Sequence, residues 1–447
     1  MSGLNRATRA NPANPRYGLF SPLTLRGRVT ILLGLALTLV CALTDQRDIL
    51  VVGLALVLVP LVAMVVVRNS RLQLSLERRV TPNEVALGES MTGQLMVTHR
   101  SRFPVGVVLL EDEVPPQLGA RPRFVVDEVS QDWQRTVRHR LQGHYRGRFH
   151  TGPLRVQLTD PFGLATVERS FTGTSELLVT PQVHVLEALP SSAAGGQTGD
   201  NRPHRIGVTG HDDVLVREYR QGDDVRRIHW RSTARRGEMM VRREEQAWDP
   251  SMTLLLDNRS GAHAGDARHG SFEWAVSMAA SVGDHFLTDG FSIELFHGQG
   301  RLDLAHVSGQ REAVRHVMVR ELAEITVRPQ PSLAPALAEL QADAAGQMVV
   351  AILGRLSPAE AAAVARVRRD RAQGIAILLD VDTWAVSGPH DPATGAVNGA
   401  GPGTVPVDPQ EVVAEILRAQ RWRVIRACAD DSVPAAWTRI GLLQGVR

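Results

Sequence analysis

Two long apolar runs stand close together near the start of the chain, and they constrain the fold more than any other feature. The first extends from Val29 to Thr44, and the second, of 19 residues, extends from Ile49 to Val67. About 20 apolar residues in a helix are needed to cross roughly 30 Å of hydrocarbon, so the second run is long enough and the first is marginal alone. The pattern predicts two transmembrane helices within residues 29–67, after a disordered basic cytoplasmic arm at 1–28.

The arginines around these runs predict the orientation of the protein in the membrane. Five arginines precede the first run and four follow the second within 12 residues, whereas the connecting turn contains only Arg47 between acidic neighbours. Because cytoplasmic flanks are enriched in Lys and Arg, both termini and the main body are expected in the cytoplasm of a plasma or inner-membrane protein. A secretory signal is the alternative, but the second apolar run follows at once.

The chain after the second apolar run divides into two regions with different hydrophobic periodicity. Residues 71–185 alternate apolar and polar positions over short stretches, which predicts an antiparallel β-sandwich. Within it, Asp160-Pro161-Phe162-Gly163-Leu164 is typical of a corner turn, with Gly163 at positive φ. Residues 191–199 are rich in glycine and serine, and a linker is predicted over 186–216.

From residue 250 to 430, short apolar runs alternate with helical segments. Strands are expected at 252–257, 291–296, 347–353, 374–381 and 422–427, and helices near 271–288, 309–324, 331–344, 357–372 and 409–419. This alternation favours a parallel sheet with helices on both faces. The expected fold class is therefore a membrane-anchored α+β multidomain protein, with a C-terminal tail at 431–447.

The segment 217–246 is the least ordinary stretch, because it interleaves nine arginines with six carboxylates. Forked pairing of arginine with carboxylate predicts a rigid, charge-paired surface element. A helix is expected to begin at Asp223 or Asp224, with Trp230 packed beneath it.

This segment resembles the signature of domain-of-unknown-function family 58. The matching residues are Arg217, Glu218, Tyr219, Gly222, Asp223, Arg226, Ile228, Trp230, Ala234 and Arg235. The paired apolar runs and the Asp160–Leu164 turn are similar too, and the α/β region resembles a von Willebrand factor type A domain. The resemblance implies a membrane protein paired with a MoxR-type AAA+ ATPase, often together with a transglutaminase-like membrane protein, and it implies no catalytic activity and no cofactor.

Type A domains often hold a divalent cation at a D-x-S-x-S loop, and this sequence departs from that pattern. After the first strand it reads Asp257-Asn258-Arg259-Ser260-Gly261, so an arginine and a glycine replace the two serines. A guanidinium beside a cation site is electrostatically adverse. We therefore expect no functional metal site, with Asp257 as a strand-end residue and Ser260 as a helix cap the only remnants. Transition-metal binding by His263, Asp266 and His269, or by His211, Asp212 and Asp213, is a weaker alternative.

The sequence predicts a non-catalytic adaptor or scaffold that binds protein partners in a cell-envelope or stress-related assembly. No phosphate-binding loop, nucleophile elbow or paired Cys-x-x-Cys motif is present in the sequence. One alternative is binding of an anionic ligand, RNA or a lipid head group, through the arginines of 217–246. The modest net charge of +3 makes nucleic acid the less favoured partner. A second alternative is a metal-dependent enzyme or adhesion-type binding at the degenerate cation site.

Overall fold

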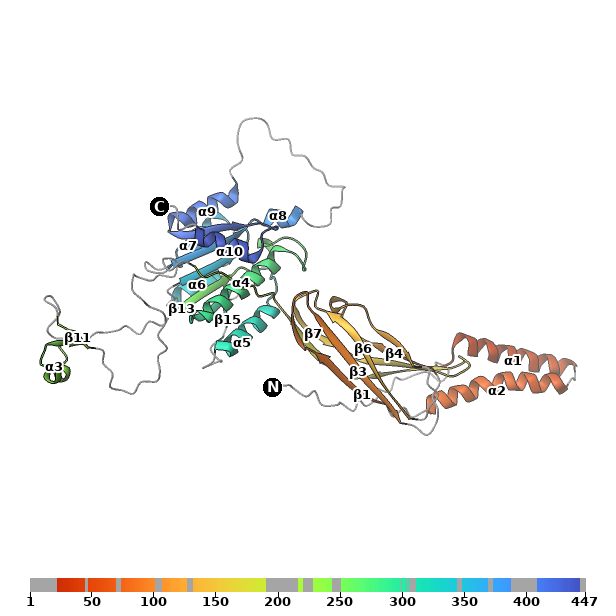
Figure 1. Ribbon diagram of the computed structural model, residues 1–447. Helices are drawn as coiled ribbons and strands as arrows, with labels where there is room; N and C mark the ends of the chain where they lie inside the picture. Colours follow the sequence, from red (N-terminus) through yellow and green to blue (C-terminus); the bar gives the residue numbers. More distant parts are fainter. Residues whose placement is uncertain are drawn as a thin grey trace, which may run out of the picture. The chain divides into compact units, whose positions relative to one another are not determined.

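The computed structural model shows a mixed α and β chain that forms two compact units. One unit lies within residues 1–182 together with Val319–Ile325, and the other lies within 183–318 and 326–447. The structure describes residues 22–44, 47–69, 74–100, 107–126, 132–189, 216–219, 228–242, 251–298, 300–302, 304, 311–343, 348–368, 373–386 and 408–442. Figure 1 identifies the elements along the chain.

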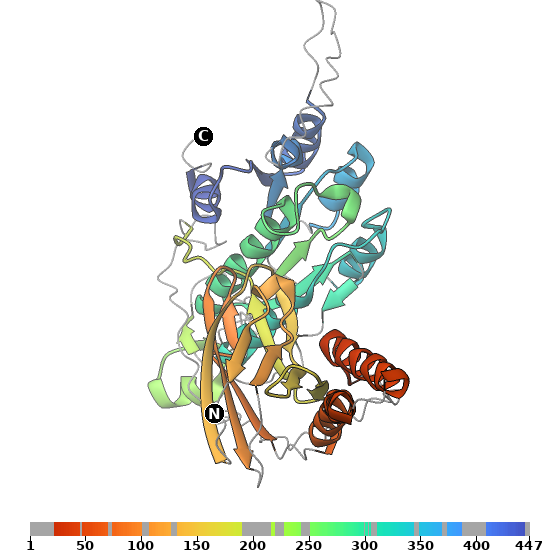
Figure 2. The same ribbon diagram turned by 90° about the vertical axis from the view of Figure 1, so that its right-hand side faces the viewer.

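The two apolar runs form helices α1 (Leu25–Thr44) and α2 (Arg47–Asn69), which lie side by side in both views (Figures 1 and 2). Their backbones approach closely at Gly34 and Gly53, where an added Cβ on either residue would meet the opposite helix. Small residues at such crossings are typical of helices that associate in lipid. Most of the large apolar side chains on both helices remain exposed, including Leu32, Val51 and Leu54.

By length and apolarity, α2 can cross a membrane, over Asp48–Arg68. In the described part of the chain α2 is the helix that meets this criterion, whereas two spans are predicted from the sequence. The first turn of α1 contains Arg26 and Arg28. Its uninterrupted apolar part is 16 residues, or about 24 Å at 1.5 Å per residue.

The sandwich expected at 71–185 is present as strands that pair almost entirely antiparallel. Two of its sheets have the strand orders β1-β3-β6 and β5-β4-β8-β9, and a third has the order β2-β10-β7, in which β10 and β2 are parallel. The bounds are β1 (Leu74–Thr81), β2 (Glu84–Ala86), β3 (Ser90–Arg100), β4 (Val107–Asp112), β5 (Arg123–Val126), β6 (Asp132–Gln142), β7 (Gly147–Thr151), β8 (Leu154–Thr159), β9 (Thr166–Phe171) and β10 (Ser175–Thr180), with the short turn η1 (Pro116–Leu118).

The core of the sandwich follows from the period-two pattern, because alternate side chains of a strand point to the same face. In β8 the buried positions are Leu154, Val156 and Leu158, with exposed or half-buried residues between them. These side chains pack with those of β1, β3, β4 and β9, and the same cluster includes Val67 from the end of α2. The end of the apolar helix pair is therefore joined to the sandwich core.

The α/β region forms a six-stranded sheet in the order β15-β14-β13-β16-β17-β18. All neighbours pair in parallel except β15, an antiparallel edge strand. The strands are β13 (Ser251–Leu256), β14 (Ser292–His297), β15 (Gly300–Leu302), β16 (Met348–Leu353), β17 (Gln373–Leu379) and β18 (Trp422–Ala427). The five strands predicted from the sequence are confirmed to within three residues. The antiparallel edge strand β15 was not predicted, because three residues are too short to show an alternating pattern.

Helices cover both faces of this sheet. Side chains of α6 (Ala334–Asp343), α7 (Pro358–Ala365) and α9 (Pro409–Ala419) share one core cluster with β16, β17 and β18. Helix α4 (Ser271–Thr288) contacts β13 and β14, and α10 (Val433–Leu442) contacts α4 and β18. The remaining helices are α5 (Arg311–Glu324) and α8 (Val381–Val386).

Residues 431–447, expected to form a tail, contribute α10 to this packing. Trp437 and Ile440 are fully buried, and the indole Nε1–H of Trp437 donates to the carbonyl of Glu187 at 2.9 Å. Both partners belong to the α/β unit. This helix was not predicted from the sequence, because ten residues are too few to show a clear helical periodicity of apolar side chains.

Candidate functional site

The most enclosed set of polar side chains in the α/β unit lies where β13 and β16 end side by side. From β13 the chain passes to β14 on one side, whereas β16 and the later strands extend on the other side, so the connections diverge here. Ligands of open α/β sheets bind beyond the carboxyl ends of the strands at such a switch point. We call the residues Asp257–Ser260, Arg355 and Glu360 the switch-point cluster.

Asp257 and Arg259 form a forked ion pair at the centre of this cluster. The guanidinium of Arg259 donates from Nε to Oδ1 of Asp257 at 2.9 Å and from Nη2 to Oδ2 at 2.8 Å. The backbone N–H of Arg259 also donates to Oδ1, at 3.1 Å. The side chain of Asp257 is fully buried and that of Arg259 is 7% exposed, so both charges are largely removed from water. Both carboxylate oxygens of Asp257 are therefore occupied by an arginine of the same loop.

The rest of the guanidinium is also satisfied from the neighbouring strand and helix. Nη1 pairs with Oε1 of Glu360 at 2.5 Å, and Nη2 donates to the carbonyl of Arg355 at 3.0 Å. Burial alone lowers the pKa of Arg259, but the hydrogen bonds and charges of Asp257 and Glu360 outweigh it and raise the pKa above its ordinary value. Arg259 is therefore a permanent cation at the point where the strands diverge.

His263 contacts the switch-point cluster through the backbone of Asp257. Because a carbonyl can only accept, the Nε2–H of His263 donates to the backbone oxygen of Asp257 at 2.7 Å, and Nδ1 accepts from the hydroxyl of Ser271 at 3.1 Å. Burial of the ring lowers the pKa of His263, and the nearby Asp257 carboxylate only partly opposes this effect. The ring is therefore neutral, and both of its nitrogens are used within the fold.

This arrangement does not fit a bound divalent cation. Asp257 lies directly after β13, as expected, but its oxygens face the guanidinium of Arg259 rather than an open site. Ser260 begins the short turn η3 (Ser260–Ala262) and makes no side-chain cap, so the predicted helix-cap role of Ser260 is wrong. Glycine at position 261 supplies no hydroxyl. The positive charge that a cation would bring is already present on Arg259.

The second metal hypothesis, on His263, Asp266 and His269, also lacks a convergent geometry. Asp266 instead caps its own turn, accepting from the backbone N–H groups of Arg268 and His269. No group of three His, Cys, Asp or Glu side chains suited to a metal occurs within the described ranges. The alternative trio at 211–213 lies outside those residues.

The signature segment forms a small element of its own around a two-stranded ribbon. Strands β11 (Val216–Glu218) and β12 (Met240–Arg242) pair antiparallel, with Arg217 opposite Val241. The ribbon continues through Tyr219, whose N–H donates to the carbonyl of Met239 at 2.8 Å. Ile228 forms a bridge with Val241, and both are buried. Gly222, Asp223 and Arg226 lie outside the described residues, as does the helix start predicted there.

A short helix, α3 (Trp230–Arg236), lies between the two strands of the ribbon along the chain. Its N-cap is His229, whose Nδ1 accepts from the backbone N–H of Ser232. Trp230 is 69% exposed rather than packed beneath a helix, which corrects the sequence interpretation. Ile228 is in a β-bridge with Val241, and Trp230 is the first residue of α3, so the indole lies at an exposed helix start.

The same helix carries arginines that are open to water. Ala234, Arg235 and Arg236 are all exposed, and Met239 beyond the helix is 50% exposed. The described part of the signature segment thus presents an indole, a thioether and two guanidinium groups on one short element.

Sequence reasoning missed the part played by Glu360. Ser357 and Glu360 form a capping box at the start of α7, which the spacing S-x-x-E signals locally. That signal gives the helix start but not the ion pair with Arg259, which lies 101 positions earlier in the chain.

Comparison with known proteins places the switch-point cluster and the signature segment in one family region. Residues 215–389 match the family model "Protein of unknown function DUF58". The DUF58 match begins at β11 and includes α3, Asp257, Arg259 and Glu360. It covers less than half of the chain.

A curated relative, the uncharacterized protein YeaD of Bacillus subtilis, is 24% identical over 222 residues. These residues are 48% of this chain and 53% of YeaD, so the chain spans about half the length of that relative.

Similarity to solved structures is weak. The alkylpurine DNA glycosylase AlkC of Pseudomonas fluorescens aligns with a TM-score of 0.16 and 16% identity, over 28% of this chain and 37% of AlkC. Cwp6 of Clostridium difficile aligns with a TM-score of 0.15 and 9% identity, over 81% of this chain and 47% of Cwp6. Scores this low carry no argument about fold or function.

Proposed function

We propose that the protein is a non-catalytic, membrane-anchored adaptor that presents its DUF58 region to a protein partner on the cytoplasmic side. The observation that carries this proposal is the exposed surface of α3, a short helix on which Trp230, Arg235 and Arg236 are all exposed. Tryptophan and arginine are the side chains that most often anchor protein interfaces. The indole of Trp230 is 69% exposed, so a partner that covers it removes apolar surface from water and thereby stabilises the complex.

The switch-point cluster supports a binding role over a catalytic one. Its polar groups are paired with each other, and the fully buried carboxylate of Asp257 already accepts three hydrogen bonds from Arg259. A parallel sheet covered by helices on both faces, with an aspartate directly after its first strand, supports the type A-like assignment of this region.

Helix α2 supplies the anchor, and we infer that α1 is the second span. The whole of α1 is 20 residues, or about 30 Å. Arg26 and Arg28 lie in its first turn, where long side chains reach the lipid head groups while their stems stay in the apolar layer. With both helices inserted, the arginine-rich flanks face the cytoplasm by the positive-inside rule.

The resemblance of the signature segment supports a MoxR-type AAA+ ATPase as the partner, with a transglutaminase-like membrane protein as the third member of the assembly. The test is affinity capture of the tagged full-length protein in mild detergent from its own host, followed by mass spectrometry. A Trp230→Ala/Arg235→Ala variant is expected to lose the AAA+ ATPase while keeping the protease-digestion pattern of the parent.

The matched control is Leu442→Ala/Arg366→Ala, which removes one exposed apolar and one exposed basic side chain from other parts of the same unit. The control is expected to retain the partner. Equal capture by the parent and the α3 variant would refute the proposed surface. Recovery of RNA or phospholipid with the parent, and of no ATPase, would favour the anionic-ligand alternative instead.

A further inference from the structure

The turn between β8 and β9, Asp160–Leu164, is built around a buried carboxylate. The carboxylate of Asp160 accepts from the backbone N–H of Ala165 at 2.5 Å and from that of Phe162 at 3.0 Å. Gly163 adopts φ 69°, a left-handed conformation that favours glycine. Asp160 is buried, whereas Phe162 at the tip is 71% exposed. A rigid turn therefore holds an aromatic ring out in solvent.

The start of α1 is fastened to this turn by backbone and side-chain bonds. The N–H of Thr24 donates to the carbonyl of Leu164 at 3.0 Å, and its hydroxyl donates to the carbonyl of Gly163 at 2.7 Å. The same hydroxyl accepts from the N–H of Gly27 at 3.1 Å, as a helix cap does. A Cβ on Gly27 would collide with the carbonyl of Leu164.

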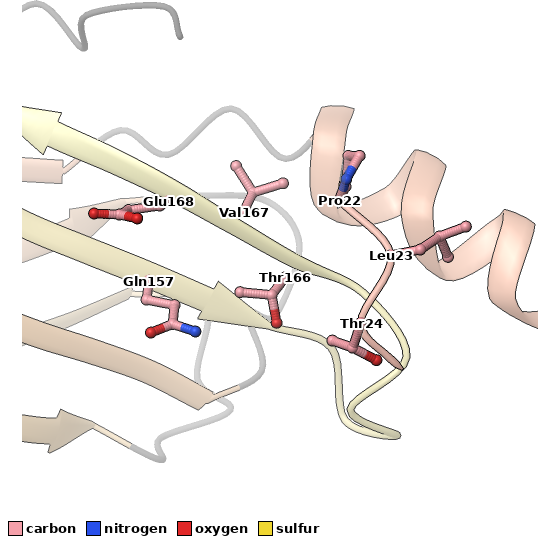
Figure 3. A pocket seen from close by; sticks show the side chains of 7 residues that line it. All are labelled: Pro22, Leu23, Thr24, Gln157, Thr166, Val167 and Glu168. Carbon is pink, nitrogen blue, oxygen red and sulfur yellow. The ribbon is translucent and has the colours of Figure 1, made fainter. Parts of the chain in front are cut away.

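Residues 22–24, directly before α1, lie beside β8 and β9, as Figure 3 shows. Leu23 forms an antiparallel bridge with Ala165, and the N–H of Thr166 donates to the carbonyl of Pro22 at 2.7 Å. The shallow pocket between them is lined by Pro22, Leu23, Thr24, Gln157, Thr166, Val167 and Glu168. Helix α1 therefore leaves the sandwich at a fixed point beside the turn.

The end of α2 returns to the same unit. Val67 is buried in the sandwich core, and Ala63 and Met64 pack against that core. The guanidinium of Arg169 on β9 reaches the carbonyl of Arg68 at 3.5 Å. Both apolar helices are thus tied to the sandwich at their arginine-bearing ends, and the turn lies at the level where their exposed apolar surface begins.

The groups exposed at this level match the interface of an anionic bilayer. Phe162 and Leu25 are 71% and 77% exposed. Arg26, Arg28 and Arg68 are exposed as well, and the Arg26 guanidinium lies over Gly163 at the tip of the turn. Apolar side chains beside arginines are typical of segments that bind at the head-group layer. The exposed acid nearby, Glu168, lies 4.0 Å from Arg155.

We propose that the Asp160–Leu164 turn is a membrane-interface anchor, in which Phe162 enters the head-group layer and Arg26 binds the phosphates of anionic phospholipids. This inference rests on the proposed insertion of α2. Its consequence is that the sandwich has a fixed orientation on the membrane rather than swinging on a tether.

The test uses the full-length chain with its two native cysteines replaced, reconstituted into phosphatidylcholine vesicles with and without phosphatidylglycerol. A polarity-sensitive fluorophore is attached through Phe162→Cys, and quenching by lipids with a nitroxide near the head group is measured. The matched control is Thr172→Cys, an exposed site at the opposite end of β9, about 20 Å away along the strand. A third variant, Val59→Cys, reports on insertion of α2.

We expect quenching at position 162 but not at 172, and stronger quenching with phosphatidylglycerol. Because one arginine near an anionic surface contributes about a fivefold change in binding, Arg26→Gln should lower the ratio of inserted to water-exposed probe about fivefold. An unquenched, water-exposed probe at 162 while position 59 is in the lipid would overturn this inference and leave the membrane anchor intact. A probe at 59 with the emission of a water-exposed fluorophore would instead overturn the proposed membrane anchor, and this inference with it.

Discussion

Removing the guanidinium of Arg259 is the sharpest test of the switch-point cluster. The substitution Arg259→Met keeps most of the volume of the side chain but leaves the carboxylate of Asp257 fully buried with no cation. The backbone N–H of residue 259 remains its donor, so one hydrogen bond to Oδ1 persists. The variant therefore isolates the loss of charge compensation.

The expected loss of stability follows from the burial of both partners. Breaking a buried ion pair by removing one member costs about 3–5 kcal/mol, because an uncompensated charge is left in the interior. Replacing both members by apolar residues is close to neutral, so Asp257→Leu/Arg259→Met should recover most of the loss. A cost of this size speeds opening of the surrounding strands about 10²–10⁴-fold.

The assay is hydrogen exchange with mass spectrometry on full-length protein in detergent, read on peptides from β13 and β16. The matched control is Arg355→Met in the same crevice, whose partner Asp382 is 79% exposed. An exposed pair contributes about 1 kcal/mol or less, so exchange should rise by less than about tenfold. Equal effects of Arg259→Met and Arg355→Met, or no recovery in the double variant, would refute the reasoning.

Three further predictions concern other parts of the fold. Gly27→Ala should detach the start of α1 from the sandwich at a cost of about 1–3 kcal/mol, which is measured as faster hydrogen exchange of the β8–β9 turn. The control Gly173→Ala, where an added Cβ meets open space, should leave that exchange unchanged. Burial first, and then a neighbouring guanidinium, lower the pKa of His139, so the unfolded chain binds a proton that the folded chain does not. Stability of the sandwich should therefore fall as the pH drops below about 6.5, and His139→Phe should flatten that dependence in the exchange of β6. Trp437→Ala should destabilise the α/β unit by about 3–5 kcal/mol by exchange of β18, and a loss below about 0.5 kcal/mol would show that α10 is a dispensable tail.

Local sequence patterns were enough to locate most secondary structure. Alternation placed the strands of the sandwich, and the α4 and α9 helices lie at the predicted bounds, Ser271–Thr288 and Pro409–Ala419. These predictions succeeded because apolar periodicity reports the face that a strand or helix buries, whatever it packs against. The same reasoning failed for α10, whose covering surface is not encoded nearby, and for Trp230, which was expected to be packed but is exposed.

The candidate sites depended on contacts between residues far apart in the sequence. The departure of Asp257–Gly261 from a cation-binding loop was readable directly from the sequence. The pairing of Arg259 with Glu360, and the fastening of Thr24 to the Asp160–Leu164 turn, were not readable, because they join positions more than 100 residues apart. By itself, the sequence determined the apolar helices, the sandwich strands and the α/β alternation, since each follows from short-range periodicity. Only the tertiary structure decided that an arginine compensates the buried aspartate and that an exposed phenylalanine lies near the start of α1 and the end of α2, since both require the chain to be folded back on itself.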